Sequence, residues 1–262
     1  MNPYIELPRV AIVRGRQDII LSRCYGKKVL HLGCVDAGLL EERFIHQELM
    51  HQKLKLVANE LWGVDVNIEG ITFLRSKGID KLIVGDICDS NTFDPLRGLT
   101  FDVILVSEVV EHLENPGLFL DAVSILMMPE TELIITVPNA FRIDTLLQLF
   151  RGIEYVHPDH NYWFSYHTLT TLVQKKGYRI GEFYVYSLQP YGLFPTFLRK
   201  SFKHDRVNTV TVPSVTSQPP VALRDRIYKY LLSFPKRILA TFLYKLTPFW
   251  GDGLIAIVHR DA

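Results

Sequence analysis

The sequence predicts an α/β fold with a mostly parallel sheet and helices on both of its faces. Short apolar runs alternate with segments of helical periodicity from residue 28 to residue 139, which is typical of parallel strands joined by right-handed crossovers. The first apolar run ends in a turn with two glycines, and acidic residues follow the next runs. The length of 262 residues is enough for one large α/β domain, or for one domain with an appendage.

Each predicted element has a local signal. Strands are predicted over residues 29–33, 61–66, 81–84, 101–107, 132–138, 178–187 and 254–259. The fourth of these runs is almost wholly apolar, as expected for a strand that is covered on both faces. Helices are predicted over most of 39–60, over 69–77 and over 168–176. A further helix should begin after Asn115, whose side chain can cap it, with Pro116 at its first position.

The composition narrows the class of protein. The net charge is only +1, which argues against a dedicated nucleic-acid binder. The three cysteines are odd in number and lack metal-like spacing, so reduced thiols are expected. Residues 1–18 contain no uninterrupted apolar stretch of the kind found in signal peptides, and no apolar run reaches the length of a membrane span. These features predict a cytoplasmic protein.

Five short motifs occur in the order that one nucleotide-binding fold requires. They are Val29-Leu30-His31-Leu32-Gly33-Cys34, Gly63-Val64-Asp65-Val66, Gly85-Asp86-Ile87, Phe101-Asp102-Val103-Ile104 with the following Glu108-Val109-Val110-Glu111-His112-Leu113, and Ile134-Ile135-Thr136-Val137-Pro138-Asn139. Together they resemble the class I S-adenosylmethionine-dependent methyltransferases over residues 28–181. The resemblance implies a Rossmann-like methyltransferase fold, S-adenosylmethionine as the cofactor and methyl transfer as the activity.

The cofactor residues are expected at the carboxyl ends of the strands. Asp65 can accept hydrogen bonds from both ribose hydroxyls, and Asp86 from the adenine amino group, while the Ile87 N–H donates to the adenine ring. Both acids also have a structural interpretation, Asp65 as a helix cap and Asp86 as a turn residue. The predicted cofactor-binding residues are His31, Gly33, Cys34, Asp36, Gly38, Asp65, Val66, Asp86, Ile87, Ser107 and Glu108.

The glycine turn, residues 33–38, departs from the family's pattern. His31 stands where an acid is usual, and Val35 stands where a second glycine is usual. Because Val35 carries a Cβ and cannot freely adopt a positive φ, either the turn follows another path or the site is degraded. Asp36 is expected either to hold the amino group of the methionine moiety or to cap the next helix.

The segment from His157 to Ser165 is the second informative motif. Two histidines with an acid between them and aromatic residues behind can line an acceptor pocket above the fifth strand. The predicted catalytic residues are His160 or His157 as the general base, with His112 and Glu111 as further candidates, because histidine titrates near the working pH. The alternative is structural, with both histidines capping a turn. Two histidines do not complete a ligand set, so no metal is predicted.

The charge is distributed unevenly along the chain. Residues 188–250 contain ten Lys and Arg against two Asp and Glu, a net charge of +8, and the rest of the chain, with 19 basic and 26 acidic residues, has −7. The predicted organisation is a methyltransferase core over 1–187, a basic and partly helical C-terminal insertion over 188–250, and the final strand over 251–262. The insertion can be a solvated cover, a lid over the acceptor, a dimer surface or a membrane-surface element.

The predicted function is O-methylation of a small molecule or sugar in glycan or secondary-metabolite biosynthesis. The basic insertion suits an anionic acceptor, and it leaves a homodimer and a peripheral membrane contact open; no nucleic-acid partner is predicted. N- or C-methylation is one alternative, since it does not require the histidine base. A non-catalytic nucleotide-binding or scaffold protein is the other, if the altered glycine turn no longer holds the cofactor.

Overall fold

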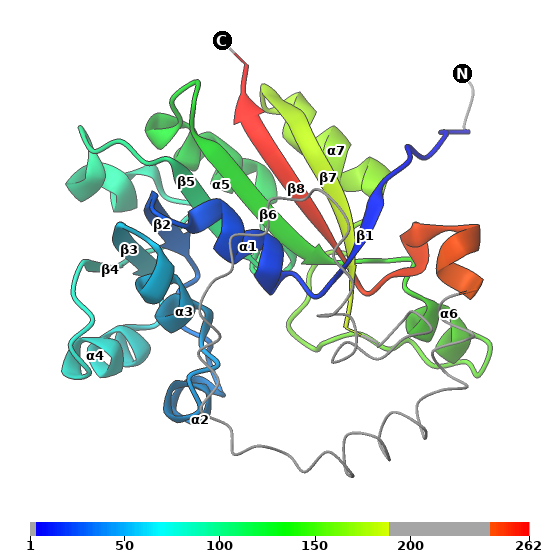
Figure 1. Cartoon of the computed structure of the whole chain (residues 1–262), viewed down its shortest axis with the longest axis horizontal. Helices are drawn as coiled ribbons and strands as arrows, with labels where there is room; N and C mark the ends of the chain where they lie inside the picture. The colour runs from blue at the N-terminus through cyan, green and yellow to red at the C-terminus, as the bar shows by residue number, and fades with distance from the viewer. Residues whose placement is uncertain (1–3, 189–241, 262) are drawn as a thin grey trace, which may run out of the picture.

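The computed structural model describes residues 4–188 and 242–261 and contains one eight-stranded sheet in the order β1-β7-β8-β6-β5-β2-β3-β4 (Figure 1). Its strands are β1 (Ala11–Arg14), β2 (Lys28–Leu32), β3 (Glu60–Asp65), β4 (Leu82–Val84), β5 (Val103–Ser107), β6 (Glu132–Pro138), β7 (Tyr178–Ser187) and β8 (Gly253–Arg260). Strand β8 pairs antiparallel with β6 and β7, and every other pairing is parallel. The prediction of a mostly parallel sheet is therefore confirmed.

Helices cover both faces of the sheet, as predicted. They are α1 (Gln17–Cys24), α2 (Leu40–Ile45), α3 (Met50–Val57), α4 (Ile68–Ser76), α5 (Pro116–Val123), α6 (Ile143–Leu149) and α7 (Tyr166–Lys175). Strand β5 is buried on both faces: Ile104 and Val106 belong to the core cluster that contains residues of α5 and α7. Its alternate residues, Val103 and Leu105, belong to the cluster that contains residues of α1 and α3. The continuous apolar run of this strand follows from its two buried faces.

The cap predicted at Asn115 is present. Its side-chain oxygen accepts a hydrogen bond from the Leu118 N–H at 3.1 Å, and Pro116 occupies the first turn of α5. Ser165 forms a reciprocal capping box with Thr168 at the start of α7. These caps satisfy N–H groups that have no partner inside their own helices.

Three parts of the predicted element order were incomplete or wrong. Strand β1 and helix α1 precede the first predicted strand; β1 has only four residues, so it carries little period-two signal. The single long helix expected over 39–60 is wrong, because the structure has α2 and α3 there, separated by a loop in which Gln47 adopts a φ of 57°. Helix α6 follows β6 where no element was assigned.

The segment 188–250 lies between β7 and β8, as its predicted place before the last strand requires. Most of it, including the basic residues between 199 and 237, lies outside the residues that the structure describes. Within its described end, Tyr244 is buried, and its hydroxyl lies 2.8 Å from the Ser187 hydroxyl at the end of β7. The described end of the insertion is therefore packed against the core.

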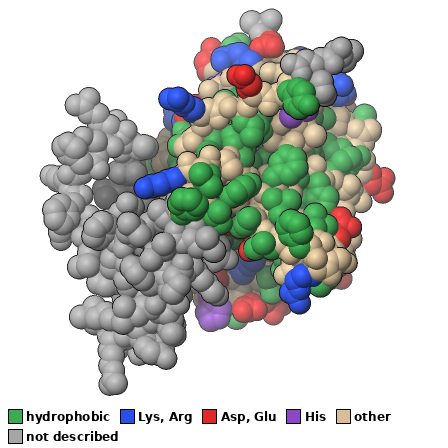
Figure 2. Space-filling view, turned by 90° about the vertical axis from the view of Figure 1, so that its right-hand side faces the viewer, with side chains coloured by type: hydrophobic (Ala, Val, Ile, Leu, Met, Phe, Trp, Pro, Cys, Tyr) green, Lys and Arg blue, Asp and Glu red, His purple; other side chains and the backbone are tan. Residues whose placement is uncertain are grey.

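One face of the molecule carries many hydrophobic side chains. Figure 2 shows them gathered on the side that lies to the right in Figure 1, where α6 is found. Leu147, Leu149 and Phe150 of this region are more than half exposed. Over residues 4–188 and 242–261, none of the helices combines the length and apolar character needed to cross a membrane.

Candidate functional site

A cavity of about 700 Å³ lies where β2, β3, β4 and β5 end. Its volume is in the range of small-molecule sites, and carboxyl ends of parallel strands are where open α/β sheets bind ligands. It brings together all the predicted site residues except one: His31, Gly33, Cys34, Asp36, Asp65, Val66, Asp86, Ile87, Ser107, Glu108, His112, His157 and His160. The exception, Gly38, lines a neighbouring hollow beside α2 and α4.

The glycine turn approaches the loop after β5 closely. Gly33 has a φ of 71°, and a Cβ there would lie 2.3 Å from a methyl of Val109, so the position requires glycine. Among the described residues other than glycine, only Gln47, Lys81 and Glu108 have a positive φ. Val35 is therefore not left-handed, so the conformation of the turn does not require a glycine at this position.

Val35 takes part in the altered turn through both its backbone and its side chain. Its N–H donates to the Asp65 carboxylate at 2.8 Å. Its side chain packs on α4, where a Cβ at Gly70 would lie 2.3 Å from a Val35 methyl. The turn is thus joined to the end of β3 and to the helix that follows it.

Asp65 presents a nearly buried carboxylate at the end of β3. Besides the Val35 N–H, it accepts the Asn67 N–H at 2.9 Å. Burial raises the pKa of this carboxyl, and the backbone N–H groups of Asn67 and Val35 oppose the rise. The cap of α4 is Asn67, whose side chain accepts the Gly70 N–H, so the cap interpretation of Asp65 is wrong. Since a carboxylate has about four acceptor positions, acceptor capacity remains for ligand hydroxyls.

The other two predicted acids, Asp86 and Asp36, each interact with residues close to them in the sequence. Asp86 is exposed at the cavity rim, and its side chain accepts the Cys88 N–H at 2.8 Å, as in a turn; the neighbouring Ile87 is buried. Asp36 forms an ion pair with Arg43, which also lines the cavity. The cap position of α2 is Leu39, so Asp36 does not cap that helix.

A network of polar side chains lies along the cavity at the end of β5. Glu108 has a φ of 57°, a strained conformation that is typical of ligand sites. Its carboxylate accepts the Thr136 hydroxyl at 2.8 Å and the Tyr186 hydroxyl at 3.1 Å. Arg16 donates to the Ser107 hydroxyl at 3.1 Å. Sequence reasoning missed Arg16, because it precedes every motif and only the tertiary fold brings it to this cavity.

Burial and neighbouring charges shift the pKa of Arg16 in opposite directions. Burial lowers the pKa of its guanidinium, but the charge of Glu108 and the contact with Tyr186 outweigh this effect and raise the pKa overall. Burial, and after it the charge of Glu108, raises the pKa of the Tyr186 hydroxyl well above its usual range. The arginine therefore places a fixed positive charge beside the cavity.

His31 is paired with a second histidine that sequence reasoning left out. The rings of His31 and His51 are stacked with centroids 5.4 Å apart, and their Nδ1 atoms lie 3.2 Å apart. Both are buried, and burial lowers both pKa values; the neighbouring His51 adds to the effect on His31, and Lys55 to that on His51, whose pKa falls to about 4. One ring therefore donates and the other accepts, with both neutral.

The lowered pKa values of His31 and His51 predict that acid destabilises the fold. The pKa of His51 is about 4 when folded and near 6.5 when unfolded, so its stability contribution is complete above pH 6.5 and is lost as the pH falls toward 4. The expected loss from His51 is about 2–3 kcal/mol between pH 7 and pH 4.5. Urea unfolding across this range should show a shallower pH dependence for His51→Gln than for the wild type. His46→Gln, at an exposed histidine, should retain the wild-type slope; equal slopes for all three proteins would contradict the assignment.

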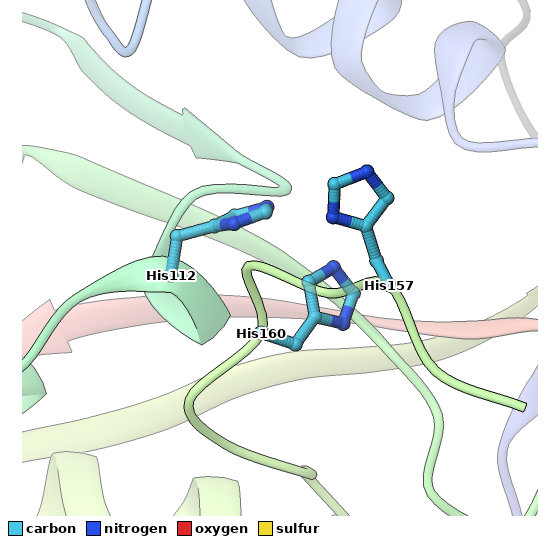
Figure 3. Close-up of side chains that lie close together, drawn as sticks. All are labelled: His112, His157 and His160. Carbon is cyan, nitrogen blue, oxygen red and sulfur yellow. The ribbon is translucent and has the colours of Figure 1, made fainter. Parts of the chain in front are cut away.

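The histidine cluster, His112, His157 and His160, also lines the cavity. Figure 3 shows the three rings facing one another. The ring centroids of His112 and His160 are 4.6 Å apart, and those of His157 and His160 are 5.3 Å apart. Burial, followed by the charges of the other two histidines, lowers the pKa of His160, which favours its neutral form.

Backbone contacts hold the cluster together. His112 ends the short helix η2 (Val110–His112) after β5, and the other two histidines lie in the loop before α7. The N–H groups of Asn161 and Tyr162 donate to the Glu111 carbonyl at 2.8 and 3.2 Å. These bonds hold η2 and the loop before α7 together, although the two segments are far apart in the sequence.

Glu111 is the most unusual group at the site. Its side chain is only 1% exposed and lines the cavity, and neither carboxyl oxygen has a hydrogen-bond partner among the described residues. Burial, and after it the negative charge of Glu108, raises the pKa of this carboxyl well above its ordinary value. A buried carboxyl without a partner is costly, and such groups concentrate at functional sites.

The chain is similar to one protein family and to several solved structures. The family model described as "Methyltransferase domain" matches residues 15–182. A SAM-dependent methyltransferase from Archaeoglobus fulgidus has 16% identity and a TM-score of 0.48, covering 94% of this chain and 91% of that one. The small RNA methyltransferase HEN1 has 17% identity and a TM-score of 0.50; the match covers this whole chain but 27% of that one. Magnesium protoporphyrin IX methyltransferase from Synechocystis PCC 6803, solved with bound SAH, has 14% identity and a TM-score of 0.46. The match covers 64% of this chain and 74% of that one.

No curated protein matches the chain. The family model nevertheless spans the glycine turn, the acids after β3 and β4, and the whole histidine cluster. The chain therefore belongs to the methyltransferase domain family.

Proposed function

We propose that this enzyme transfers the methyl group of S-adenosylmethionine to a hydroxyl of a small molecule or sugar. The observation that carries the proposal is the histidine cluster, which lines the same cavity as the glycine turn and Asp65. Methyl transfer from a sulfonium mainly needs the nucleophile, the methyl carbon and the sulfur held in line, which is catalysis by positioning. A hydroxyl acceptor also has to lose its proton.

The cofactor is proposed to lie across the strand ends, with its nucleoside on the side of β3 and β4. Asp65 has acceptor positions left for the ribose hydroxyls, and Asp86 lies at the rim, in reach of an adenine amino group. Asp36 and Arg43 are an oppositely charged pair on the cavity wall, suited to the amino and carboxylate groups of the methionine moiety. The sulfonium then points toward the end of β5 and the histidine cluster.

The histidine cluster is the proposed means of removing the acceptor proton. His160 or His157 is the candidate base, and the lowered pKa of His160 keeps a free lone pair on its ring at neutral pH. An amine or carbon acceptor would not need these histidines. O-methylation is therefore favoured over N- or C-methylation by the cluster itself.

The experiment that tests the acceptor class uses S-adenosylmethionine with a radiolabelled methyl group. The full-length enzyme is incubated with sugar, phenol and amine acceptors, and the products are separated. Label should enter the hydroxyl acceptors and form ether bonds. Label found only in amines, or only on carbon, would overturn the proposed acceptor class and leave the family assignment intact.

The basic insertion is proposed to govern the acceptor and not the cofactor. Its net charge is +8, and that of the rest of the chain is −7, so it should attract an anionic acceptor, an anionic membrane or the acidic face of a second subunit. Neutralising Arg224, Arg226, Lys229, Lys236 and Arg237 together should leave S-adenosylmethionine affinity unchanged. It should weaken acceptor binding, liposome association or dimerisation, and flatten the salt dependence of that interaction. If all three are unaffected, the insertion is a solvated cover.

A further inference from the structure

The histidine cluster has the donor set of a metal site. One ring nitrogen from each of His112, His157 and His160 lies within 4.8 Å of the others. Nitrogens that bind one tetrahedral zinc ion at about 2.1 Å lie roughly 3.4 Å apart. Rotation of the side chains would have to bring the three nitrogens from within 4.8 Å of one another to this closer spacing. A set of three histidines with an open fourth position is a known catalytic zinc arrangement.

The surroundings of His112 support this interpretation. Its Nδ1 lies 3.1 Å from the Asp159 carbonyl, to which it must donate, because a carbonyl only accepts. Its Nε2 is then the nitrogen with a free lone pair. The Asn161 side chain also donates to the His112 carbonyl at 2.8 Å. Metal-binding histidines almost always donate their other ring N–H in this way, which fixes the tautomer and the ring orientation.

Glu111 provides an independent observation that points to a cation. Its Oε1 lies 4.0 Å from the His112 Nε2, and both of its buried oxygens lack a hydrogen-bond partner in the described part of the chain. The Nδ1 of His160 is also buried without one. Such unpaired polar atoms are costly in a protein interior. A divalent ion among the three rings would give the unpaired His160 nitrogen a partner. It would also place a positive charge beside the Glu111 carboxylate.

We propose that His112, His157 and His160 bind a divalent transition-metal ion, with zinc as the closest match to three imidazole ligands. The inference rests on the proposed O-methylation and deepens it: the bound ion, in place of a histidine ring, assists the loss of the acceptor proton. The open position takes the acceptor hydroxyl, whose proton is released to solvent as the ion stabilises the alkoxide. The alkoxide oxygen then forms a bond to the methyl carbon. The carbon–sulfur bond breaks, and its electron pair stays on sulfur, giving the neutral thioether.

The test is zinc binding by the full-length protein, with any purification tag removed. The protein is stripped with a chelator, dialysed and titrated with zinc chloride by calorimetry. The wild type should bind one ion per chain. His112→Ala, His157→Ala and His160→Ala should each weaken binding by at least tenfold. His167→Ala is the matched control, an exposed histidine at the start of α7 outside the cavity, and should bind zinc as the wild type does.

Titration with S-adenosylhomocysteine accompanies each measurement and shows that every variant is folded. Absence of stoichiometric zinc binding by the wild type, or zinc binding that the three cluster variants leave unchanged, overturns the inference. Undiminished methylation of a hydroxyl by the stripped enzyme in the presence of chelator also overturns it, and leaves the proposed function standing with a histidine ring as the base. Zinc binding without any S-adenosylhomocysteine binding would instead refute the proposed function.

Discussion

Replacing Asp65 by alanine is expected to weaken S-adenosylmethionine binding about a hundredfold. In the proposed complex the carboxylate accepts two ribose hydroxyls, and loss of two hydrogen bonds to a charged acceptor costs about 2–3 kcal/mol. The change also removes the acceptor for the Val35 N–H, so the glycine turn loses one of its hydrogen bonds to the end of β3, while the bond from the Gly33 N–H to the Val64 carbonyl at 2.9 Å remains. Both effects act on affinity in the same direction. Calorimetric titration with S-adenosylmethionine measures the total loss of affinity from both effects.

Two further variants make the Asp65 experiment decisive. Asp65→Asn keeps the volume and one acceptor oxygen, so its affinity should fall between those of the wild type and Asp65→Ala. Asp80→Ala removes an exposed carboxylate from the loop before β4, outside the cavity, and should bind as the wild type does. Wild-type affinity in Asp65→Ala would show that the cofactor does not use this carboxylate.

Replacing His160 by alanine is expected to lower turnover by ~10²–10⁴ while cofactor affinity is retained. The ring belongs to the loop before α7 and not to the strand ends that carry Asp65 and Asp86, so its loss should leave the nucleoside contacts in place. The expected rate effect is similar whether the ring takes the acceptor proton itself or holds an ion that stabilises the alkoxide. Steady-state kinetics with a hydroxyl acceptor and S-adenosylhomocysteine titration separate the two quantities.

The control for this experiment is again His167→Ala, which should retain the wild-type rate. His157→Ala is expected to behave like His160→Ala, because the two rings are neighbours in the cluster. If turnover survives in both cluster variants, the histidines are structural and the acceptor needs no assisted loss of its proton.

Local patterns predicted most of the sheet and the cap of α5. The apolar run of β5 and the Asn115-Pro116 start of α5 are signals carried by neighbouring residues, and both appear in the structure. The break between α2 and α3 depends on a left-handed residue at Gln47, which the apolar periodicity does not encode. Strand β1 is short and lies at the edge of the sheet, so its position depends on pairing with β7.

The site was predictable to the extent that its residues follow strands. The glycine turn, Asp65 and Asp86 come directly after β2, β3 and β4, and the cavity contains all of them. The contact of His112 with the loop at 157–160 was not predictable in the same way. It depends on hydrogen bonds between residues 49 or more positions apart, such as those from the Asn161 side chain to the His112 carbonyl and from the Asn161 N–H to the Glu111 carbonyl. Two histidines in one loop did not suggest a metal site, and the third comes from another strand end.

Calorimetric titration of the wild-type protein with S-adenosylmethionine tests the central claim most directly. The altered glycine turn keeps Gly33 in a left-handed conformation and binds Asp65 through Val35, so it should still hold the cofactor. The predicted result is saturable binding of one S-adenosylmethionine per chain, with S-adenosylhomocysteine competing for the same site. A folded protein that binds neither compound would contradict the account and would favour a scaffold role on a methyltransferase fold.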